Sequence, residues 1–171
     1  VPGARAADDG PIKIGIIAPI SGDRAQIGGD IEAGFKVYLD EVKGTIAGRK
    51  IQLIVEDEGT PTTATTKTRK LITHDKVDVL AGLFNSSSAY AVAPLAKEAN
   101  VPLVITASAG DDSTQRKATP NQLRVNACGS QAGHTAGQYA YEQLKWRRVA
   151  IIGAGPAGLA TAIRLKQLAA S

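Results

Sequence analysis

Residues 12–22 read IKIGIIAPISG, a short β-branched run closed by a proline and a Ser-Gly pair, which predicts a buried strand that ends in a turn. A helical period of apolar residues then runs from Ile27 to Val42 and stops near Gly44. The alternation continues, with strands predicted over 51–55, 77–83 and 101–106 and helices over 62–73 and 86–100. Strands that alternate with helices imply right-handed βαβ crossovers. The expected fold class is therefore α/β, a Rossmann-like parallel sheet with helices on both faces.

A break in this rhythm divides the chain. Between Ala107 and Asn121 the sequence turns to polar residues and proline, which indicates a boundary between a first α/β lobe over 12–120 and a partial second α/β unit over 121–171. The second unit is predicted to hold strands at 123–126 and 148–152 and helices at 130–144 and 156–169. Two strands cannot bury a core of their own, so we expect this unit to lean on the first sheet or on material outside the chain.

The first eleven residues show no periodic pattern, and we expect residues 1–11 to be disordered or to be the remnant of a signal peptide. Ala4-Arg5-Ala6 fits the small-x-small rule for the end of a secretory signal, with cleavage after Ala6. An Ala-rich tail matches the same rule by chance just as readily. The signal peptide itself is not in this chain.

Composition narrows the function classes. With 43% hydrophobic and 21% charged residues, the chain is typical of one globular domain, and no apolar stretch of about 18 residues could span a bilayer as a helix. The net charge of +4 comes from one end, because residues 143–171 carry five Lys and Arg and no acid. Since aromatic residues make up only 4% and no basic stripe runs through the body, nucleic acid is not an expected partner.

The loops that follow the predicted strands are the places to look for a ligand, since parallel sheets bind ligands at the carboxyl ends of their strands. Four loops rich in small hydroxyl or acidic residues stand there: PISGD at 19–23, EDEG at 56–59, NSSS at 85–88 and TASAG at 106–110. Ser86, Ser87 and Ser88 fall where a helix begins, so backbone N–H groups, hydroxyls and the helix dipole could converge on a carboxylate. In the alternative interpretation one serine is only an N-cap and the others are solvated.

Catalytic and metal chemistry find little support. Glu56, Asp57 and Glu58 suit a general acid-base pair or a site for a ligand ammonium group, although such clusters are more often solvated. The chain has no G-x-S-x-G elbow, and its one cysteine, Cys128, is expected to be a small buried filler. His74 and His134 lack metal-ligand spacing. We therefore expect no catalytic residues and no metal, and a binding protein rather than an enzyme.

A family resemblance joins these pieces. IKIGIIAPISG (12–22) and QIGGD (26–30) resemble the start of type I periplasmic solute-binding proteins, in the branch that serves branched-chain amino acid ABC uptake. The likeness continues through IVEDEGTP (54–61), LAGLFNSSS (80–88), AVAPLA (91–96), VPLVI (101–105) and RRVAIIG (147–153). In such proteins two lobes close over the ligand like a hinged trap and dock on a membrane permease. The resemblance implies one such lobe plus the start of the second, in a periplasmic or exported protein.

The resemblance also implies site residues. It puts Ser86 and Ser87 at the carboxylate of a small ligand such as an amino acid or an aromatic acid, with further contacts from Ala107, Ser108 and Ala109. Ile27 would flank the ligand side chain, and Asp57 would shape the cleft rather than touch the ligand. The small residues of the 106–109 loop look similar to members that take aromatic acids, so the ligand class stays open.

The end of the chain departs from this family. Gly153, Gly155 and Gly158 form a G-x-G-x-x-G fingerprint directly after a predicted strand, at the opening of a helix. The segment over about 149–170 resembles FAD-dependent oxidoreductases of the electron-transfer flavoprotein ubiquinone oxidoreductase type, which implies FAD as a cofactor. The chain ends before the acidic residue that would hold the ribose. A junction between two sources would fall at about 145–153.

Three function hypotheses follow. The first is a truncated or chimeric solute-binding module without catalysis. The second is a small Rossmann-like protein that binds FAD or NAD at Gly153–Gly158. The third is an oligomerising α/β scaffold without a ligand, because surface that should face a missing half becomes a site for association as a homo-oligomer.

Overall fold

The computed structural model describes residues 10–151 and 156–170. Six strands form one sheet in the order β2-β3-β1-β4-β5-β6. All neighbours in it are parallel except β2 and β3, which are antiparallel. The strands are β1 (Ile12–Ala18), β2 (Thr45–Ile46), β3 (Arg49–Asp57), β4 (Val79–Gly82), β5 (Leu103–Ile105) and β6 (Gln122–Arg124). The expected α/β class with a mostly parallel sheet is confirmed.

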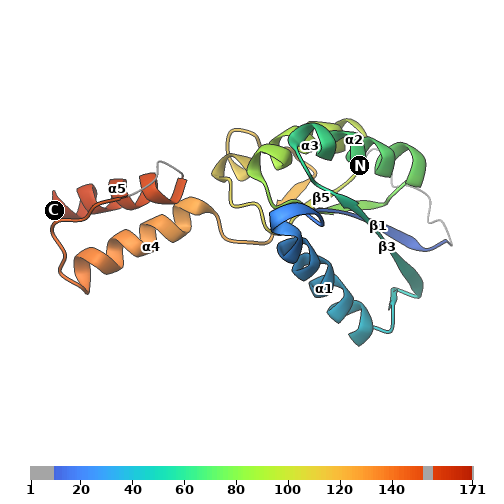
Figure 1. Cartoon of the computed structure of the whole chain (residues 1–171), viewed down its shortest axis with the longest axis horizontal. Coiled ribbons are helices and arrows are strands. Elements are labelled where there is room, and N and C mark those ends of the chain that lie inside the picture. Colours follow the sequence, from blue (N-terminus) through green and yellow to red (C-terminus); the bar gives the residue numbers. More distant parts are fainter. Residues whose placement is uncertain (1–9, 152–155, 171) are drawn as a thin grey trace.

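Helices lie on both faces of this sheet, with α2 and α3 on one side and α1 on the other (Figure 1). The α-helices of the described residues are α1 (Ala25–Glu41), α2 (Pro61–Lys70), α3 (Ser86–Glu98), α4 (Gly129–Glu142) and α5 (Pro156–Ala169). A π-helical turn, Leu71–Asp75, extends α2, and 3₁₀ turns stand at Gly22–Arg24 and Asp111–Thr114. Expectations for the helices at 62–73, 86–100, 130–144 and 156–169 are confirmed to within a few residues.

The core lies between the sheet and the α2–α3 layer. Its buried members come from β1, β4, β5, α2, α3 and the segments next to them, and they include Ile17, Leu71, Leu80, Val92 and Leu103. The opposite face is thinly covered, because the only buried residue of α1 is Gly28. The two faces of the sheet are therefore unequal, and much of the apolar surface near α1 stays open.

The sequence prediction missed β2. This strand pairs with the start of β3 through a tight turn in which Ala47 and Gly48 both have positive φ, 52° and 78°. Two consecutive positive φ values are typical of a type I′ hairpin turn. An Ala-Gly pair is a weak signal for it, because alanine rarely adopts that conformation.

The second unit differs from its prediction. The segment expected to open it, 123–126, contributes β6 to the edge of the first sheet, where it pairs in parallel with β5. The strand predicted at 148–152 is wrong over its described part, since residues 148–151 form no strand. Strand residues need a hydrogen-bonded neighbour, and the described residues place none beside them. What the second unit holds is a pair of helices, α4 and α5, which reach away from the sheet (Figure 1).

Glycines let these two helices approach closely. Gly133 faces Ala157 and Ala160, and a Cβ at Gly137 would lie 3.0 Å from the carbonyl oxygen of Thr161. Thr161 also donates a hydrogen bond to the carbonyl oxygen of Gly133 at 3.0 Å. Because both contacts advance along the two helices together, α4 and α5 run in the same direction.

Candidate functional site

The loops after β1, β3 and β4 meet at the carboxyl edge of the sheet and enclose a hollow of about 400 Å³. Its lining is mostly small or polar: Pro19, Ser21, Asp23, Arg24, Gly59, Thr60, Pro61, Asn85 and Ser87. Ligands of parallel α/β sheets bind at this edge. The hollow is thus the natural candidate for a binding site in this lobe.

The start of α3 offers backbone donors at this edge. Its N-cap is Asn85, whose side chain makes no capping hydrogen bond to the helix. The first backbone bond of the helix runs from the Ala89 N–H to the Asn85 carbonyl oxygen at 3.0 Å, so the N–H groups of residues 86–88 precede it and are not used by the helix backbone. The alternative interpretation, in which a serine caps α3, is therefore wrong.

The three serines differ in exposure. Ser87 is exposed and lines the hollow, whereas Ser86 is half-buried. Ser88 is fully buried, and its Oγ has no hydrogen-bond partner among the described residues. A buried hydroxyl without a partner is uncommon in proteins.

The loop after β5 meets Ser86. The fully buried Ser108 donates a hydrogen bond from its Oγ to the Oγ of Ser86 at 3.2 Å. A Cβ at Gly110 would lie 2.8 Å from both the Cβ and the Oγ of Ser86. Ala107 is half-buried and Ala109 is exposed beside this contact. The structure therefore brings together the 86–88 and 107–110 segments that the sequence singled out.

The remaining predicted ligand residue stands apart. Ile27 lies half-buried in the first turn of α1 and belongs neither to the lining of the hollow nor to the Ser86–Ser108 contact. Next to it, Gly28 packs against the backbone of Pro19, which fixes α1 to the loop after β1.

The three consecutive carboxylates have three separate roles. Glu56 pairs with Lys67 at 2.7 Å and with Lys70 at 2.6 Å, and hydrogen bonds from these lysines lower the pKa of Glu56. Asp57 accepts hydrogen bonds from the Ile20 N–H at 3.1 Å and from the Ser21 Oγ at 2.5 Å, and so shapes the loop after β1.

The third carboxylate is buried. Glu58 is fully inaccessible to solvent, and its two carboxylate oxygens accept the N–H groups of Phe84 and Asn85 at 2.9 and 2.8 Å. The expectation of a solvated cluster is wrong for this residue. Since each carboxylate has its own partners, the run does not form an acid-base pair.

Arg24 is a site residue that the sequence prediction missed. Its guanidinium donates to the Oδ1 of Asn85 at 2.5 Å and lies 5.3 Å from the centroid of the Phe84 ring. It lines the hollow beside Ser87, where it supplies positive charge. The only sequence signal was a cation directly after the Ser-Gly-Asp turn that follows the first strand.

Cys128 and the histidines occupy ordinary places. Cys128 is buried at the N-cap of α4, with its Sγ 3.2 Å from the Oγ of Ser130. The His74 side chain is 79% exposed, and His134 is exposed on α4. Within 10–151 and 156–170, no group of three or more His, Cys, Asp or Glu side chains is placed to hold a metal ion. No helix in these ranges is long and apolar enough to cross a membrane.

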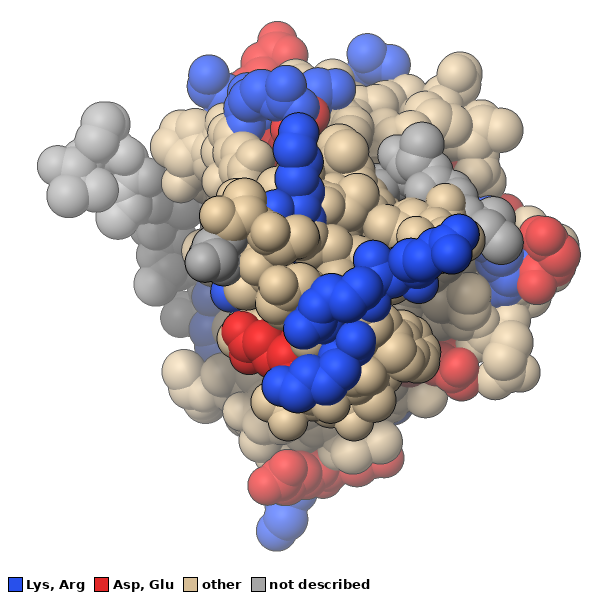
Figure 2. All heavy atoms as spheres, turned by 90° about the vertical axis from the view of Figure 1, so that its left-hand side faces the viewer, with Lys and Arg blue, Asp and Glu red and all other residues tan. Residues whose placement is uncertain are grey.

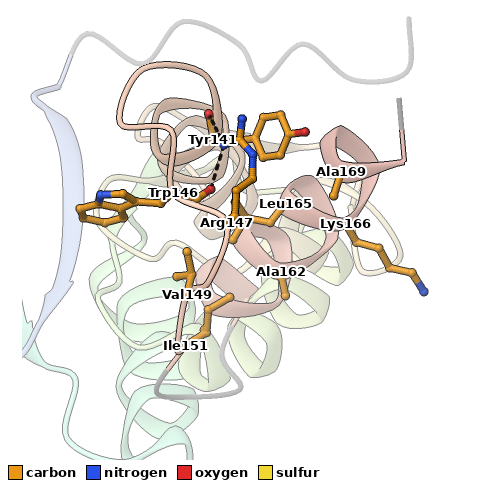
Figure 3. Close-up of a pocket in the computed structure, with 9 residues that line it drawn as sticks. All are labelled: Tyr141, Trp146, Arg147, Val149, Ile151, Ala162, Leu165, Lys166 and Ala169. Atoms are coloured by element: carbon orange, nitrogen blue, oxygen red, sulfur yellow. Dashed lines mark hydrogen bonds between the residues drawn. The ribbon is translucent and has the colours of Figure 1, made fainter.

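The glycine fingerprint is only partly described. Gly153 and Gly155 lie outside the described residues, and Gly158 lies in the first turn of α5. Beside this helix a separate hollow of about 320 Å³ is lined by aromatic, basic and aliphatic side chains (Figure 3). In it Arg147 lies 4.0 Å over the ring of Tyr141 and donates to the Tyr141 carbonyl oxygen at 3.0 Å. Lys and Arg side chains gather over this end of the molecule (Figure 2).

The chain is similar to known proteins over most of its length. A family model described as periplasmic binding protein matches residues 11–167. The chain is 32% identical over 159 residues to the Leu/Ile/Val-binding protein BraC3 of Rhizobium johnstonii, which covers 90% of this chain and 43% of that protein.

Solved structures agree with this placement. An ABC transporter substrate-binding protein from Sphaerobacter thermophilus superposes with a TM-score of 0.83 at 33% identity, over 92% of this chain and 45% of the other. A solute-binding protein of an ABC transporter from Rhodopseudomonas palustris HaA2, solved in complex with p-hydroxybenzoic acid, has a TM-score of 0.83 at 31% identity, over 94% of this chain and 44% of the other. The chain thus spans about half the length of the relatives it matches.

Proposed function

Since the chain belongs to the periplasmic binding protein family, we propose that it is a solute-binding module that holds the carboxylate of an amino acid or an aromatic acid at the start of α3. Relatives of both ligand classes are similar to it, a Leu/Ile/Val-binding protein and a protein bound to p-hydroxybenzoic acid. The module itself carries out no chemistry on the ligand. It would present the ligand to an ABC permease from the periplasmic side.

The start of α3 carries this proposal. The N–H groups of residues 86–88 are not used by the helix backbone, and the helix dipole adds positive potential at the same place. The hydroxyls of Ser86 and Ser87 add donors, and Arg24 adds a formal charge in the hollow. Ser108 and the small residues Ala107 and Ala109 complete the proposed ligand site from the next loop. Ile27 has no part in this proposed site, because it belongs neither to the lining of the hollow nor to the Ser86–Ser108 contact.

One lobe binds more weakly than a closed pair of lobes, because a ligand on one wall stays half solvated. We expect dissociation constants near the millimolar range for this chain, which corresponds to about 4 kcal/mol of binding free energy.

A calorimetric and thermal-shift screen tests the proposal. The purified chain is titrated with leucine, valine, phenylalanine, benzoate, 4-hydroxybenzoate, FAD and NAD, because any ligand that binds only the native state raises its melting temperature. A shift with one carboxylate class would support the proposal and identify that class. A shift with FAD or NAD alone would move the function to Gly153, Gly155 and Gly158, and to oxidoreductase chemistry.

A second candidate function rests on the open face near α1. A shallow apolar hollow of about 470 Å³ lies between α1 and the β5–β6 edge, lined by Ile31, Phe35, Tyr38, Val104 and Val125 among others. Apolar surface of this kind favours association. If no small molecule stabilises the chain while it forms a defined oligomer, the scaffold hypothesis would replace the solute-binding one.

A further inference from the structure

The segment that leads from β4 into α3 has an unusual backbone conformation at residues 82 and 83. Gly82, the last residue of β4, and Leu83, which follows it, both adopt positive φ, 103° and 66°. Glycine tolerates this conformation freely, but leucine does not, because its Cβ crowds the backbone. A bulky residue in this region needs surroundings that fix it there, and such residues cluster at functional sites.

Two sets of contacts hold the first half of this loop. The Leu83 side chain is fully buried in the core, and its N–H donates to the Ile17 carbonyl oxygen of β1 at 2.7 Å. The Gly82 carbonyl oxygen accepts the N–H of Thr106 at 2.9 Å, which ties the loop to the end of β5.

The second half is held by one side chain. The buried carboxylate of Glu58 accepts the N–H of Phe84 through one oxygen and the N–H of Asn85 through the other. The backbone of Glu58 is anchored in turn, since its N–H donates to the Ala18 carbonyl oxygen at 2.9 Å. One residue thereby joins the ends of β1 and β3 to the start of α3.

We propose that Glu58 is a positioning residue for the ligand site, which sets where on the α3 start a ligand carboxylate is received. The inference rests on the proposed function. Glu58 uses up the two N–H groups just before the helix, at Phe84 and Asn85. Its negative charge also repels a second carboxylate from that position. The N–H groups that face a ligand therefore begin at Ser86.

Glu58 does not touch the ligand in this arrangement, because it is fully buried behind the loop. Its effect passes through the two amides of Phe84 and Asn85. Hydrogen bonds to a buried charged group are stronger than neutral ones, which suits them to hold a strained turn.

Glu58→Gln tests the inference with little change in shape. A glutamine side chain has one oxygen and one NH₂ group, so only one of the two amides keeps an acceptor while the other faces a donor. We expect the exchange rate of one or both of the Phe84 and Asn85 amide protons to rise at least about tenfold, because a charge-assisted bond is lost. We expect affinity for the carboxylate probe, leucine or 4-hydroxybenzoate, to fall by a similar factor.

Glu56→Gln is the matched control. It removes a carboxylate two residues earlier, at the end of β3, whose partners are Lys67 and Lys70 rather than the loop. We expect it to alter stability and to leave the exchange of the Phe84 and Asn85 amides and the affinity unchanged. Leucinamide, which lacks the carboxylate, should lose much less affinity than leucine in Glu58→Gln.

Amide exchange on the wild-type chain needs no variant and no ligand. If the amides of Phe84 and Asn85 are unprotected in the wild-type chain, the inference is overturned even should Glu58→Gln fail to fold. Wild-type affinity in a folded Glu58→Gln chain would overturn it as well. If the wild-type chain binds no carboxylate probe, the proposed function fails, while the protection of these two amides still decides whether Glu58 holds the loop.

Discussion

Ser86, Ser87 and Ser88 are identical in the sequence, yet the fold gives them three environments. Ser86 receives a hydrogen bond from the buried Ser108, Ser87 lines the open hollow, and Ser88 is buried without a partner for its Oγ among the described residues. Only the first two can meet a ligand from solvent. Whether a serine at the start of this helix can bind a ligand therefore depends on whether the neighbouring loops leave its hydroxyl accessible.

The double substitution Ser86→Ala and Ser87→Ala should weaken binding of the carboxylate ligand by about 1–3 kcal/mol, since it removes hydroxyl donors to a charged group. The change is measured by calorimetric titration of the ligand identified in the screen. Thr135→Ala is the control, because the Thr135 hydroxyl is exposed on α4 and bonds only within its own helix. Equal affinity in the double variant and the control would contradict a carboxylate-binding site at Ser86 and Ser87.

Gly110→Ala should distort the same site from the opposite loop. The added methyl group would meet the Tyr90 hydroxyl first and would also lie 2.8 Å from the Cβ of Ser86, which is closer than side-chain carbons approach. We expect a loss of about 1–3 kcal/mol in unfolding free energy, as for overpacked positions, together with weaker ligand binding.

Gly34→Ala is the control variant for Gly110→Ala, and chemical denaturation measures the unfolding free energy of both. Gly34 lies inside α1 with nothing within 4 Å of an added Cβ. Alanine favours the helix over glycine by about 1 kcal/mol, so this variant should gain stability and keep its affinity. Two variants of the same chemical kind would thus move stability in opposite directions. If Gly110→Ala keeps wild-type stability and ligand affinity, the loop after β5 can move to make room for the methyl group, and the prediction is wrong.

At the level of elements, ion pairs between β3 and α2 stabilise the fold, and this stabilisation depends on pH. Glu56 at the end of β3 accepts from two lysines on α2, and the Glu56 side chain is only 12% exposed. The hydrogen bonds from Lys67 and Lys70 hold the pKa of Glu56 below that of a free glutamate side chain. A carboxylate whose pKa is lower in the folded state stabilises that state above the unfolded pKa, and this stability is lost as the pH falls through the folded value.

Glu56→Gln should therefore lower the free energy of unfolding at pH 7, because it removes the charge that the two lysines stabilise. The loss should be only about 1 kcal/mol, since both lysine side chains are partly solvated. The difference from the wild-type chain should persist down to about pH 5 and shrink at lower pH, as the wild-type carboxylate is protonated. Urea denaturation at several pH values between 3 and 7 measures it. A difference that is constant over this range would mean that packing, not charge, is what the substitution disturbs.

The sequence predicted those elements whose signal is local. The β-branched run at 12–18 and the helical period after Ser86 became β1 and α3, because their apolar residues face one core. The helical period before Val42 became α1, although Gly28 is its only buried residue. The strand at 148–151 failed, since strand pairing depends on a neighbour that no local pattern reveals. Glu58 was named as part of an acidic cluster, but its role was missed for a similar reason: its partners, Phe84 and Asn85, lie 26 and 27 residues away.

At the level of the whole molecule, the sheet is covered unequally. The α2–α3 side holds the buried core, whereas the α1 side leaves Val104 of β5 next to Leu123 of β6, with Leu123 64% exposed and Val125 beyond it 68% exposed. Leu123 and Val125 fall on one face because strand side chains alternate. The aligned relatives are about twice as long as this chain. An apolar face of this kind is expected to be covered by further polypeptide, whether from a second copy or from another chain.

Self-association of the chain through this face is therefore expected, and Val125→Lys should reduce it. Lysine at this position would place a charge on the apolar hollow, and burying that charge in an interface is unfavourable. Sedimentation velocity over a range of protein concentrations measures the change, with an expected weakening of at least about tenfold in the association constant. Val37→Lys is the matched control, since Val37 is equally exposed, at 69%, but lies outside the hollow. If the wild-type chain sediments as a monomer throughout, the open face does not drive association. If both variants weaken association equally, the contact is electrostatic and not confined to the β5–β6 edge.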